Sequence, residues 1–470
     1  MTMIDLQLRP LWTAREIADA VGGRASVDFA INGVSYDSRE VGAGDLFVAL
    51  TGENTDGHRF LPQAFARGAA GAIVSEPIDE PHILVDDSMA ALEAMAKASR
   101  ARSDAKIIGV TGSAGKTGTK EALFAALDRY SRGKAHRSVK SYNNHVGVPL
   151  SLARMPAATK FGIFEMGMNH PGELSALTRI VRPNVAIVTV IAPAHAGFFK
   201  DEAEIADAKG EIFEGLEPGG TAIVPFDSPH YERLRAKAEK HAAHVVTFGF
   251  KEGADVRALD HVRATGGGSL VTAKIGPRML VYTVREPGDH WIGNSLALLA
   301  AVDAVGGDLA MAGLALAELA EMPGRGARHQ VPVRGGSLLV IDESYNANPA
   351  SMAATIRELG REDAVRKLVC LGAMKELGDK SDGYHAGLAE PLEDANVAFA
   401  ALVGPEMQAL AKALAKRPGW DGKYAHCGSA EEAIAILSQH LRADDALLVK
   451  GSNAVGLAKV VDALTGDNDN

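Results

Sequence analysis

Short apolar runs that alternate with helical stretches predict an α/β chain. In the middle of the sequence such runs occupy residues 107–110, 161–164 and 185–191, with helical patterns between them. Runs of this kind are typical of strands buried on both faces, so they favour a mainly parallel sheet with crossover helices. Further runs predict antiparallel strands added to the same sheet at 221–226, 245–250, 270–275 and 279–284.

The same pattern divides the chain into three domains. Residues 1–105 predict a small N-terminal α/β domain, residues 106–328 hold the central sheet, and residues 329–470 predict a C-terminal α/β domain. A segment rich in Gly, Pro and Arg at 323–336 lies at the second boundary and predicts a hinge. The strands expected in the outer domains are 46–49, 72–74, 83–85, 338–341, 368–371, 399–403 and 447–449.

Composition and charge exclude several classes of protein. The chain has 470 residues, 47% hydrophobic and 23% charged, which is typical of a globular protein. Its net charge of −10 argues against nucleic acid as the main partner. No apolar run approaches the roughly 18 residues of a membrane span, and the N-terminus lacks a signal-peptide pattern. Two cysteines, Cys370 and Cys427, favour a reducing compartment, so we expect a cytoplasmic protein.

A glycine-rich loop follows the first central strand and opens a helix. Its sequence is TGSAGKT, from Thr111 to Thr117. Backbone amides there can cradle phosphates, Lys116 can neutralise them, and the Thr117 hydroxyl can bind magnesium. The strict G-x-x-x-x-G-K-[ST] spacing fails, because Val110 stands five residues before Gly115, and a surface turn is the alternative. We expect ATP to be bound by Gly112, Ser113, Ala114, Gly115, Lys116, Thr117 and Gly118.

Two polar residues lie where central strands end. Glu165 follows the apolar run 161–164, and His195 comes shortly after the run 185–191. Ligands of doubly wound sheets bind at the carboxyl edge of the strands, so these side chains can help Thr117 to hold a metal ion. The alternatives are a solvated strand-end glutamate and a structural loop histidine.

Lys209 lies on the apolar face of a predicted helix. It is four residues after Ile205 and four before Phe213. Burial would lower the pKa of the lysine and make a neutral amine available for nucleophilic or carbamate chemistry. Extension of the ammonium group to the surface is the alternative.

Polar residues also gather at strand tips of the third domain. Asp342 begins the segment 342–349, and two further tips lie at Gly372 and at 450–452. Several polar tips at one edge suggest a second ligand surface that faces the first. Ordinary turn chemistry is the alternative. The predicted fold class is therefore α/β in three domains: a small N-terminal α/β domain, a central P-loop ATPase-like domain with a mainly parallel sheet, and a C-terminal Rossmann-like domain.

Taken together, these segments resemble the Mur ligase family, the ATP-dependent amide-bond-forming enzymes of bacterial cell-wall synthesis. Besides TGSAGKT, the resemblance rests on Ser35-Tyr36-Asp37-Ser38-Arg39, residues 44–50, Asp56-Gly57-His58, Asn143-Asn144, residues 147–150, Glu165-Met166-Gly167, Ala192-Pro193-Ala194-His195, residues 208–212, and Ser344-Tyr345-Asn346-Ala347-Asn348-Pro349. The combination is most similar to the member that adds D-alanyl-D-alanine to UDP-N-acetylmuramoyl-tripeptide.

The resemblance implies roles for individual residues. Lys209 would be a carbamylated lysine, and its carbamate would hold magnesium together with Thr117, Glu165 and His195; Lys116, Lys209, His195 and Glu165 would carry catalysis. Asn294 would contact the adenine of ATP, Arg325 the γ-phosphate and Asp342 the ribose. The uridine diphosphate part of the substrate would be held by Asp37, Ser38 and Arg39, and Tyr345, Asn346 and Asn348 would help to position nucleotide or dipeptide. The other substrate-binding residues would be Asp56, Gly57, His58 and Asn144.

The resemblance also implies binding partners, although some residues depart from the family pattern. The substrates would be ATP with Mg²⁺, UDP-N-acetylmuramoyl-tripeptide and D-alanyl-D-alanine, with no nucleic acid, no membrane span and a monomeric enzyme. Ala373 replaces a usual acidic residue, Asn453 stands where arginine is frequent, and residues 196–199 differ from the family pattern. The first two bear on contacts of the third domain only.

Two other functions remain open. A folate polyglutamate synthetase would share the phosphate loop and the carbamylated lysine, although the segments at Asp37 and Asp56 argue for a uridine diphosphate site. A non-catalytic module that uses ATP as a switch would hydrolyse ATP, or not, regardless of a dipeptide.

Overall fold

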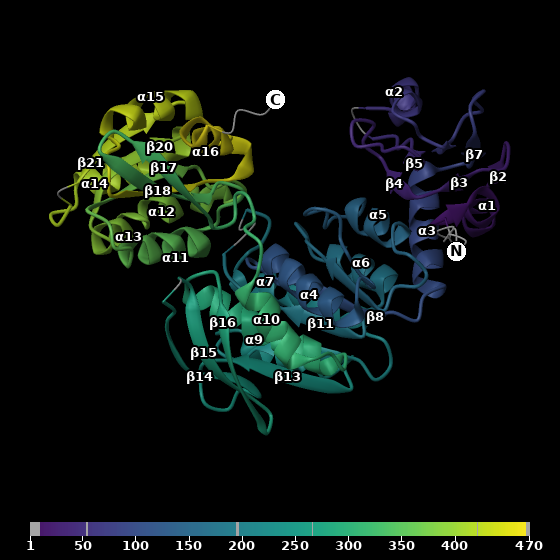
Figure 1. Ribbon diagram of the computed structural model, residues 1–470, viewed down its shortest axis with the longest axis horizontal. Helices are drawn as coiled ribbons and strands as arrows, with labels where there is room; N and C mark the ends of the chain where they lie inside the picture. Colours follow the sequence, from purple (N-terminus) through teal and green to yellow (C-terminus); the bar gives the residue numbers. More distant parts are fainter. Residues whose placement is uncertain (1–9, 53–54, 194–196, 266, 421, 467–470) are drawn as a thin grey trace, which may run out of the picture.

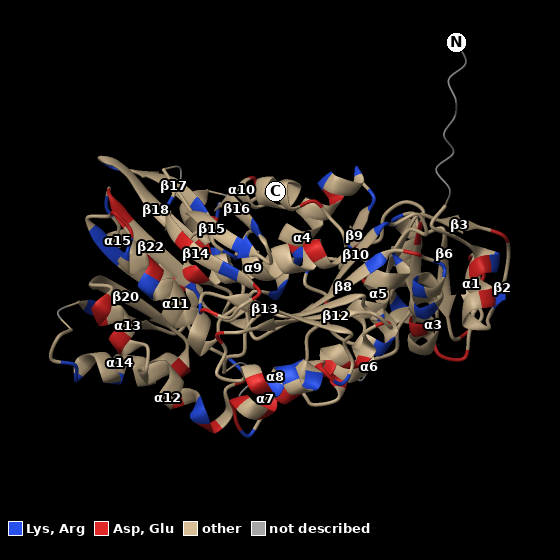
Figure 2. Ribbon diagram, turned by 90° about the horizontal axis from the view of Figure 1, so that it is seen from below, with Lys and Arg blue, Asp and Glu red and all other residues tan. Residues whose placement is uncertain are grey.

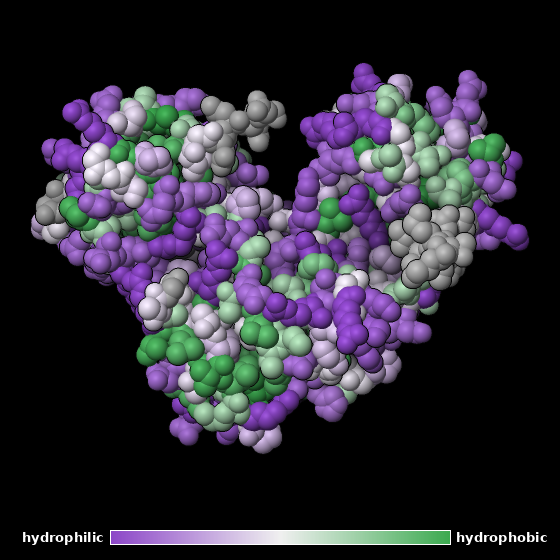
Figure 3. Space-filling view, viewed as in Figure 1, coloured by the Kyte–Doolittle hydropathy of each residue, from purple (hydrophilic) through white to green (hydrophobic). Residues whose placement is uncertain are grey.

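The structure is a computed structural model that describes residues 10–52, 55–193, 197–265, 267–420 and 422–466. Three α/β lobes follow one another along the chain, as Figure 1 shows, which confirms the predicted fold class. The N-terminal and C-terminal lobes stand on either side of the central lobe. The space-filling view shows a deep hollow between these two outer lobes (Figure 3).

The N-terminal lobe contains a five-stranded sheet of order β2-β7-β6-β5-β4, in which only β2 is antiparallel to its neighbour. Its first helix begins at a capping box in which the side chains of Thr13 and Glu16 bond each other's backbone amides. Its strands are β1 (Trp12–Thr13), β2 (Arg24–Ala25), β3 (Ala30–Ile31), β4 (Gly33–Ser35), β5 (Asp45–Val48), β6 (Gly71–Val74) and β7 (His82–Leu84); its helices are α1 (Ala14–Val21), η1 (Gly57–Phe60), α2 (Leu61–Ala66) and α3 (Ser88–Ala101).

The central lobe is built on a nine-stranded sheet of order β16-β15-β14-β13-β12-β11-β8-β10-β9. Its strands are β8 (Lys106–Thr111), β9 (Ala135–Arg137), β10 (Phe161–Glu165), β11 (Val185–Val188), β12 (Thr221–Pro225), β13 (His244–Gly249), β14 (Val256–Arg263), β15 (Ser269–Ile275) and β16 (Arg278–Val284). Its helices are α4 (Lys116–Ser131), α5 (Gly147–Ala153), α6 (Glu173–Val181), α7 (Glu202–Gly210), η2 (Glu211–Gly215), α8 (Tyr231–Ala238), α9 (Asp289–Ala304) and α10 (Leu309–Ala317).

The direction of two central strands differs from the prediction. β12 and β13 are parallel to their neighbours, because the charged helix α8 crosses over between them. Among the described strands of this sheet, the antiparallel pairs are β14–β15 and β15–β16, so β15 runs against the other strands. The sequence analysis did not identify β14. The expectation of antiparallel strands at 221–226 and 245–250 was therefore wrong.

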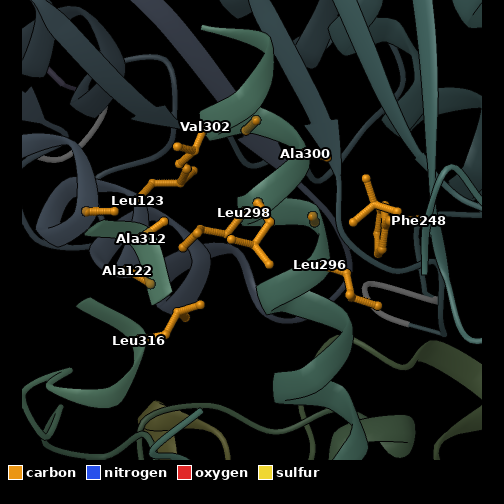
Figure 4. Packing of buried hydrophobic residues seen from close by; sticks show 14 of the residues in the cluster. Ala122, Leu123, Phe248, Leu296, Leu298, Ala300, Val302, Ala312 and Leu316 are labelled. Atoms are coloured by element: carbon orange, nitrogen blue, oxygen red, sulfur yellow. The ribbon is translucent and has the colours of Figure 1, made fainter. Parts of the chain in front are cut away.

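Apolar cores cover both faces of the central sheet. On one face α4, α9 and α10 pack against the strands, and Figure 4 shows Leu298 of α9 among side chains of α4 and α10. On the other face α6, α7 and α8 pack together with α3 of the N-terminal lobe. Burial on both faces explains why the central strands are apolar without alternation.

The C-terminal lobe has a six-stranded sheet of order β17-β18-β22-β19-β20-β21, in which only β17 is antiparallel. Cores on both faces make it a doubly wound fold. Its strands are β17 (Ala327–Val333), β18 (Gly336–Glu343), β19 (Arg366–Gly372), β20 (Val397–Val403), β21 (Lys423–Cys427) and β22 (Asp445–Lys450). Its helices are α11 (Pro349–Gly360), η3 (Gly378–Lys380), α12 (Ser381–Ala386), α13 (Ala389–Asp394), η4 (Pro405–Met407), α14 (Gln408–Ala415), α15 (Ala430–His440), η5 (Asn453–Val455) and α16 (Ala458–Thr465).

The surface carries mixed charge. In the ribbon of Figure 2, basic and acidic residues are interspersed along the outer helices, for example on the neighbouring α7 and α8. There Arg233 pairs with Asp207 at 2.7 Å. None of the helices in the described part of the chain combines the length and apolar character that a bilayer span requires.

The burial of Leu298, on α9, against α4 and α10 yields a stability prediction. We expect Leu298→Ala to lower the free energy of unfolding by about 2–5 kcal/mol, because it leaves a cavity in a closely packed core. Leu314→Ala is the control, since Leu314 is 51% exposed on α10 and should change stability by about 0.5 kcal/mol or less. Urea denaturation followed by circular dichroism measures both, and equal losses would contradict the assignment of Leu298 to the core.

Candidate active site

The glycine-rich loop joins β8 to α4 and has no space for side chains at two of its glycines. Gly112 has φ +150°, and a Cβ there would lie 1.9 Å from Thr189 Oγ1. Gly115 has φ +79°, and a Cβ there would lie 2.7 Å from Asn294 Oδ1. Both positions therefore require glycine. Thr189, which the sequence analysis missed, donates a hydrogen bond of 2.6 Å to the carbonyl of Ala114 and so fixes the loop.

Lys116 lies at the first position of α4 and turns back over the loop. Its Nζ donates a hydrogen bond of 2.8 Å to the carbonyl of Gly112. Desolvation lowers the pKa of Lys116; the carboxylate of Glu165 opposes this effect, and the charge of Arg325 adds to it. A phosphate brought to the loop would restore a counter-charge to this ammonium group.

Glu165 ends β10 and is 2% exposed. Its Oε2 accepts a hydrogen bond of 2.8 Å from Thr117 Oγ1, and its Oε1 accepts one of 2.8 Å from Asn143 Nδ2. The sequence-based pairing of Thr117 with Glu165 is therefore present in the structure. Three polar side chains, each carrying an oxygen that can bind Mg²⁺, meet here.

Asn143 reaches this cluster, whereas its neighbour Asn144, predicted as a substrate-binding residue, bonds elsewhere. The side chain of Asn144 accepts hydrogen bonds from the amides of Val146 and Gly147, at 3.2 and 2.9 Å, and fixes the turn before α5. The two asparagines are adjacent in the sequence, so only the backbone direction, which no motif reveals, separates their roles.

Lys209 is buried at the end of α7, as predicted, with 1% of its surface exposed. Burial, strengthened by repulsion from Lys116, lowers the pKa of Lys209 well below its ordinary value. Among the residues that the structure describes, no carboxylate forms an ion pair with it. Its amine is thus a buried group with a depressed pKa, next to the phosphate loop. His195 lies outside the described residues.

A pocket of about 500 Å³ opens between the central and C-terminal lobes. On the central side it is lined by the loop from Ser113 to Gly118 with Asn143, Glu165 and Asn294. Arg325 lines it from the connection between the lobes, where its guanidinium lies 4.1 Å from the ring centroid of Tyr345 and donates to Ser141 Oγ at 3.2 Å. On the C-terminal side the predicted residues that line it are Tyr345, Asn346 and Asn348.

Asn348 bonds the two lobes directly to each other. Its Oδ1 caps the start of α11 by accepting from the amide of Ser351 at 2.9 Å, while its Nδ2 donates to the carbonyl of Ser113 at 3.2 Å. The second bond joins the C-terminal lobe to the phosphate loop itself.

Asp342 is not among the residues that line this pocket. Its two oxygens accept hydrogen bonds from the amides of Gly324 and Ser344, at 2.6 and 3.0 Å. It is 5% exposed, so the carboxylate holds the connection between the lobes in place. A ribose bound by Asp342 would have to share the carboxylate oxygens with the amides of Gly324 and Ser344.

The strand tip at 450–452, singled out from the sequence, supplies Lys450 to the pocket, whereas His290 and Trp291 were not selected. Lys450 ends β22, is 2% exposed, and donates to Glu343 Oε2 at 2.9 Å and to the carbonyl of Asn346 at 3.1 Å. His290 and Trp291 line the pocket one turn before Asn294 on α9. The position of Lys450 at a strand end was a usable signal, whereas nothing local marks His290 or Trp291.

The predicted residues of the N-terminal lobe do not line this pocket and form hydrogen bonds within their own lobe. Arg39 pairs with Asp37 at 2.6 Å and lowers the pKa of that carboxyl, and Ser38 donates to Gln63 at 2.8 Å. His58 contacts Asp56 at 2.7 Å. Between them, Gly57 lies so close to the backbone of residues 49–50 that a side chain has no space there.

The departures from the family pattern are structural. Ala373 is fully buried, and its carbonyl accepts from the amide of Ser452 at 3.2 Å. Asn453 begins η5, and neither residue lines the pocket. Gly197, in the third departing segment, donates its amide to the carbonyl of Glu376 at 2.9 Å and so joins the central and C-terminal lobes.

The donor set around Thr117 fits a magnesium ion that is shared with phosphates. The structure shows one buried carboxylate, a hydroxyl and an amide beside a glycine cradle. Mg²⁺ is usually bound by one or two carboxylates plus substrate phosphates. In the part of the chain that the structure describes, no three His, Cys, Asp or Glu side chains are grouped to hold a metal ion by themselves.

Comparison with known proteins gives consistent matches along the chain. Residues 30–102 match the Mur ligase family catalytic domain, residues 110–302 the Mur ligase middle domain, and residues 327–453 the Mur ligase, glutamate ligase domain. UDP-N-acetylmuramoyl-tripeptide--D-alanyl-D-alanine ligases from Rickettsia prowazekii and Escherichia coli are each 32% identical over 96% of this chain, and over 99% and 98% of their own lengths.

Solved structures agree with these matches. The structure of MurF from Acinetobacter baumannii has a TM-score of 0.84 at 29% identity and covers 97% of this chain and 99% of its own. MurF ligase from Thermotoga maritima in complex with ADP has a TM-score of 0.76 at 26% identity, with 93% and 97% covered. The chain therefore belongs to the Mur ligase family.

Proposed function

We propose that this protein joins D-alanyl-D-alanine to UDP-N-acetylmuramoyl-tripeptide with hydrolysis of ATP to ADP and phosphate. The observation that carries the proposal is the pocket in which the phosphate loop of the central lobe meets polar strand tips of the C-terminal lobe. Relatives that bear the name of this activity match the chain over nearly its full length.

Each lobe has its own part in this proposal. The central domain, residues 106–328, binds ATP through the amides of the glycine-rich loop, Lys116 and Asn294. The N-terminal domain, residues 1–105, holds the uridine diphosphate through Asp37, Ser38 and Arg39, with the turn at 56–58 beside them. The C-terminal domain, residues 329–470, positions nucleotide and dipeptide through Tyr345, Asn346 and Asn348. The polar residues found in each lobe support this assignment.

Charge at the phosphate loop supports phosphoryl transfer. A carboxylate is a poor acyl donor, so the γ-phosphoryl group of ATP is first transferred to the terminal carboxylate of the tripeptide, which gives an acyl phosphate and ADP. Lys116 and Arg325 both face the pocket and can stabilise the charge that spreads over the transferred oxygens. When bound, Mg²⁺ neutralises phosphate charge, and Thr117, Glu165 and Asn143 are the described residues that would hold it.

Amide formation completes the reaction. The free amine of D-alanyl-D-alanine attacks the acyl carbon, loses a proton, and phosphate leaves from the tetrahedral intermediate. The acyl phosphate must be kept from water. The bond of Asn348 to Ser113 joins the two lobes across the pocket, and Arg325, in the connection, contacts Ser141 on one side and Tyr345 on the other, which supports this role.

Lys209 supports a second negatively charged site. With a depressed pKa, its neutral amine can add to carbon dioxide and lose a proton, which leaves a carbamate with two oxygens. We propose that this carbamate, together with His195, serves the magnesium ions of the reaction.

The proposal extends to the oligomeric state of the protein and to its location in the cell. We propose a monomeric cytoplasmic enzyme, with two free, buried cysteines, Cys370 and Cys427, as expected in a reducing compartment.

Two alternatives are less favoured. Escherichia coli FolC shares the fold at a TM-score of 0.60, but at only 19% identity this likeness supports the architecture alone. A switch module without catalysis does not account for an ammonium and a guanidinium that face the same pocket beside a buried carboxylate.

The proposed reaction predicts a strict dependence on both peptide substrates. We expect phosphate release from ATP only when UDP-N-acetylmuramoyl-tripeptide and D-alanyl-D-alanine are both present. A coupled phosphate assay with a panel of dipeptides and with dihydrofolate plus glutamate measures this. Release with the folate pair would identify the folate enzyme, and release that is indifferent to the dipeptide would favour the switch module.

The geometry of Gly115 predicts a loss of nucleotide binding on substitution. A left-handed conformation costs an L side chain roughly 1–2 kcal/mol, and Asn294 blocks the added carbon. We therefore expect Gly115→Ala to weaken ADP binding by about tenfold or more in calorimetric titration. Gly383→Ala on α12 is the control, because nothing lies within 4 Å of its added Cβ and binding should be unchanged. Native affinity for ADP in Gly115→Ala would refute the role of the glycine-rich loop in nucleotide binding.

The carbamate predicts a chemical rescue. We expect Lys209→Ala to lower turnover by about two orders of magnitude or more, because a charged ligand is lost, and short carboxylic acids to restore part of it. Lys240→Ala, at an exposed lysine beyond α8, should keep full turnover with or without the acid. Full activity of untreated Lys209→Ala would exclude the carbamate role.

A further inference from the structure

Lys120 is a fully buried lysine on α4 that the reaction described above does not use. It lies one turn after Thr117 on the helix that follows the phosphate loop, and none of its side chain is exposed. It does not line the pocket. A buried ammonium group is costly unless it is paired and hydrogen-bonded, so its partners indicate its role.

The partners of Lys120 belong to a neighbouring loop and to a carboxylate. Its Nζ donates to the carbonyl of Ser138 at 3.4 Å and, at shorter range, to the carbonyl of Lys140. It also pairs with Glu121 Oε1 at 2.9 Å, and Glu121 Oε2 in turn pairs with Nε of Arg137, in β9, at 2.9 Å. Lys120 thus holds the segment that follows β9 against α4.

The chain that leaves β9, residues 138–143, surrounds Glu165; we call it the clamp loop. Ser138 Oγ accepts a hydrogen bond of 3.0 Å from the amide of Glu165. Asn143 Nδ2 donates to Glu165 Oε1 at 2.8 Å. Both ends of the clamp loop therefore fix the residue whose other oxygen is held by Thr117.

We propose that Lys120 is a positioning residue for the metal–nucleotide site and acts through the clamp loop. The inference rests on the proposed function only in that Glu165 is taken to serve Mg²⁺ with ATP. The start of α4 holds Glu165 in two ways: directly through Thr117, and indirectly through Lys120, Ser138 and Asn143. One rigid helix thereby fixes both the phosphate cradle and the carboxylate beside it.

Removal of the ammonium group of Lys120 should loosen the hold on Glu165 without impairing nucleotide binding in the pocket. Lys120→Met keeps the length of the side chain but leaves the carbonyls of Ser138 and Lys140 without their donor. Groups that orient a metal ligand typically account for about 10- to 100-fold in metal affinity. The affinity for nucleotide without metal depends on the glycine cradle and should not change.

The test measures metal binding apart from activity. Mn²⁺ is titrated into the full-length protein with ADP, and free Mn²⁺ is followed by electron paramagnetic resonance. We expect the Kd for Mn²⁺ to rise by about 10- to 100-fold in Lys120→Met, and by less in Lys120→Arg, which keeps the charge. ADP affinity without metal should stay within about twofold of the native value. Lys97→Met, at a lysine with 62% of its side chain exposed on α3, is the control and should bind as the native protein does.

Several results would overturn the proposal. Native Mn²⁺ affinity in Lys120→Met excludes it, and so does a parallel loss of metal-free ADP binding, which would indicate general disorder. If Lys120→Met does not fold, Ser138→Ala decides, because it removes the loop's hydrogen bond to Glu165 and should also weaken Mn²⁺ binding. The experiment contains no peptide substrate, so a wrong assignment of the ligase reaction would leave its outcome unaffected.

Discussion

The structure depends on holding one buried carboxylate, Glu165, beside a cradle for phosphate. A carboxylate that is 2% exposed can persist only where donors surround it. Thr117 supplies one donor from α4, Asn143 another from the clamp loop, and Ser138 binds the backbone amide. The parallel sheet makes this possible, because it brings the ends of β8 and β10 to one edge with the loops that follow them.

The same edge faces a second lobe, and the connection between the two is itself structured. Asp342 binds the amide of Gly324, next to Arg325, whose guanidinium stacks on Tyr345 and reaches Ser141. The carboxylate expected to bind ribose thus helps to place the guanidinium that faces the phosphate loop. Backbone contact between Gly197 and Glu376 fixes the lobes at a second point.

The sequence predicted those parts of the site that follow from local order. The loop from Gly112 to Thr117 was recognisable because strand, glycines and helix are contiguous, and Lys209 because its helical face is apolar. The sequence did not predict which asparagine of 143–144 meets Glu165, since adjacent residues of one type differ only in backbone direction. It also misjudged β12 and β13, because the crossover helix α8 is short and charged and resembles a loop.

The clamp loop contacts the N-terminal lobe and the connection to the C-terminal lobe, which limits how the site can be assembled. In the N-terminal lobe, Glu40 pairs with Lys140 at 2.5 Å and accepts from Tyr142 at 3.2 Å, directly after the segment proposed to bind uridine diphosphate. In the middle of the same loop, Ser141 accepts from Arg325. Glu40 and Arg325 therefore hold neighbouring residues of a loop whose two ends fix Glu165. A shift of the N-terminal lobe or of the connection to the C-terminal lobe acts on the same carboxylate, so the geometry around Glu165 depends on the position of both.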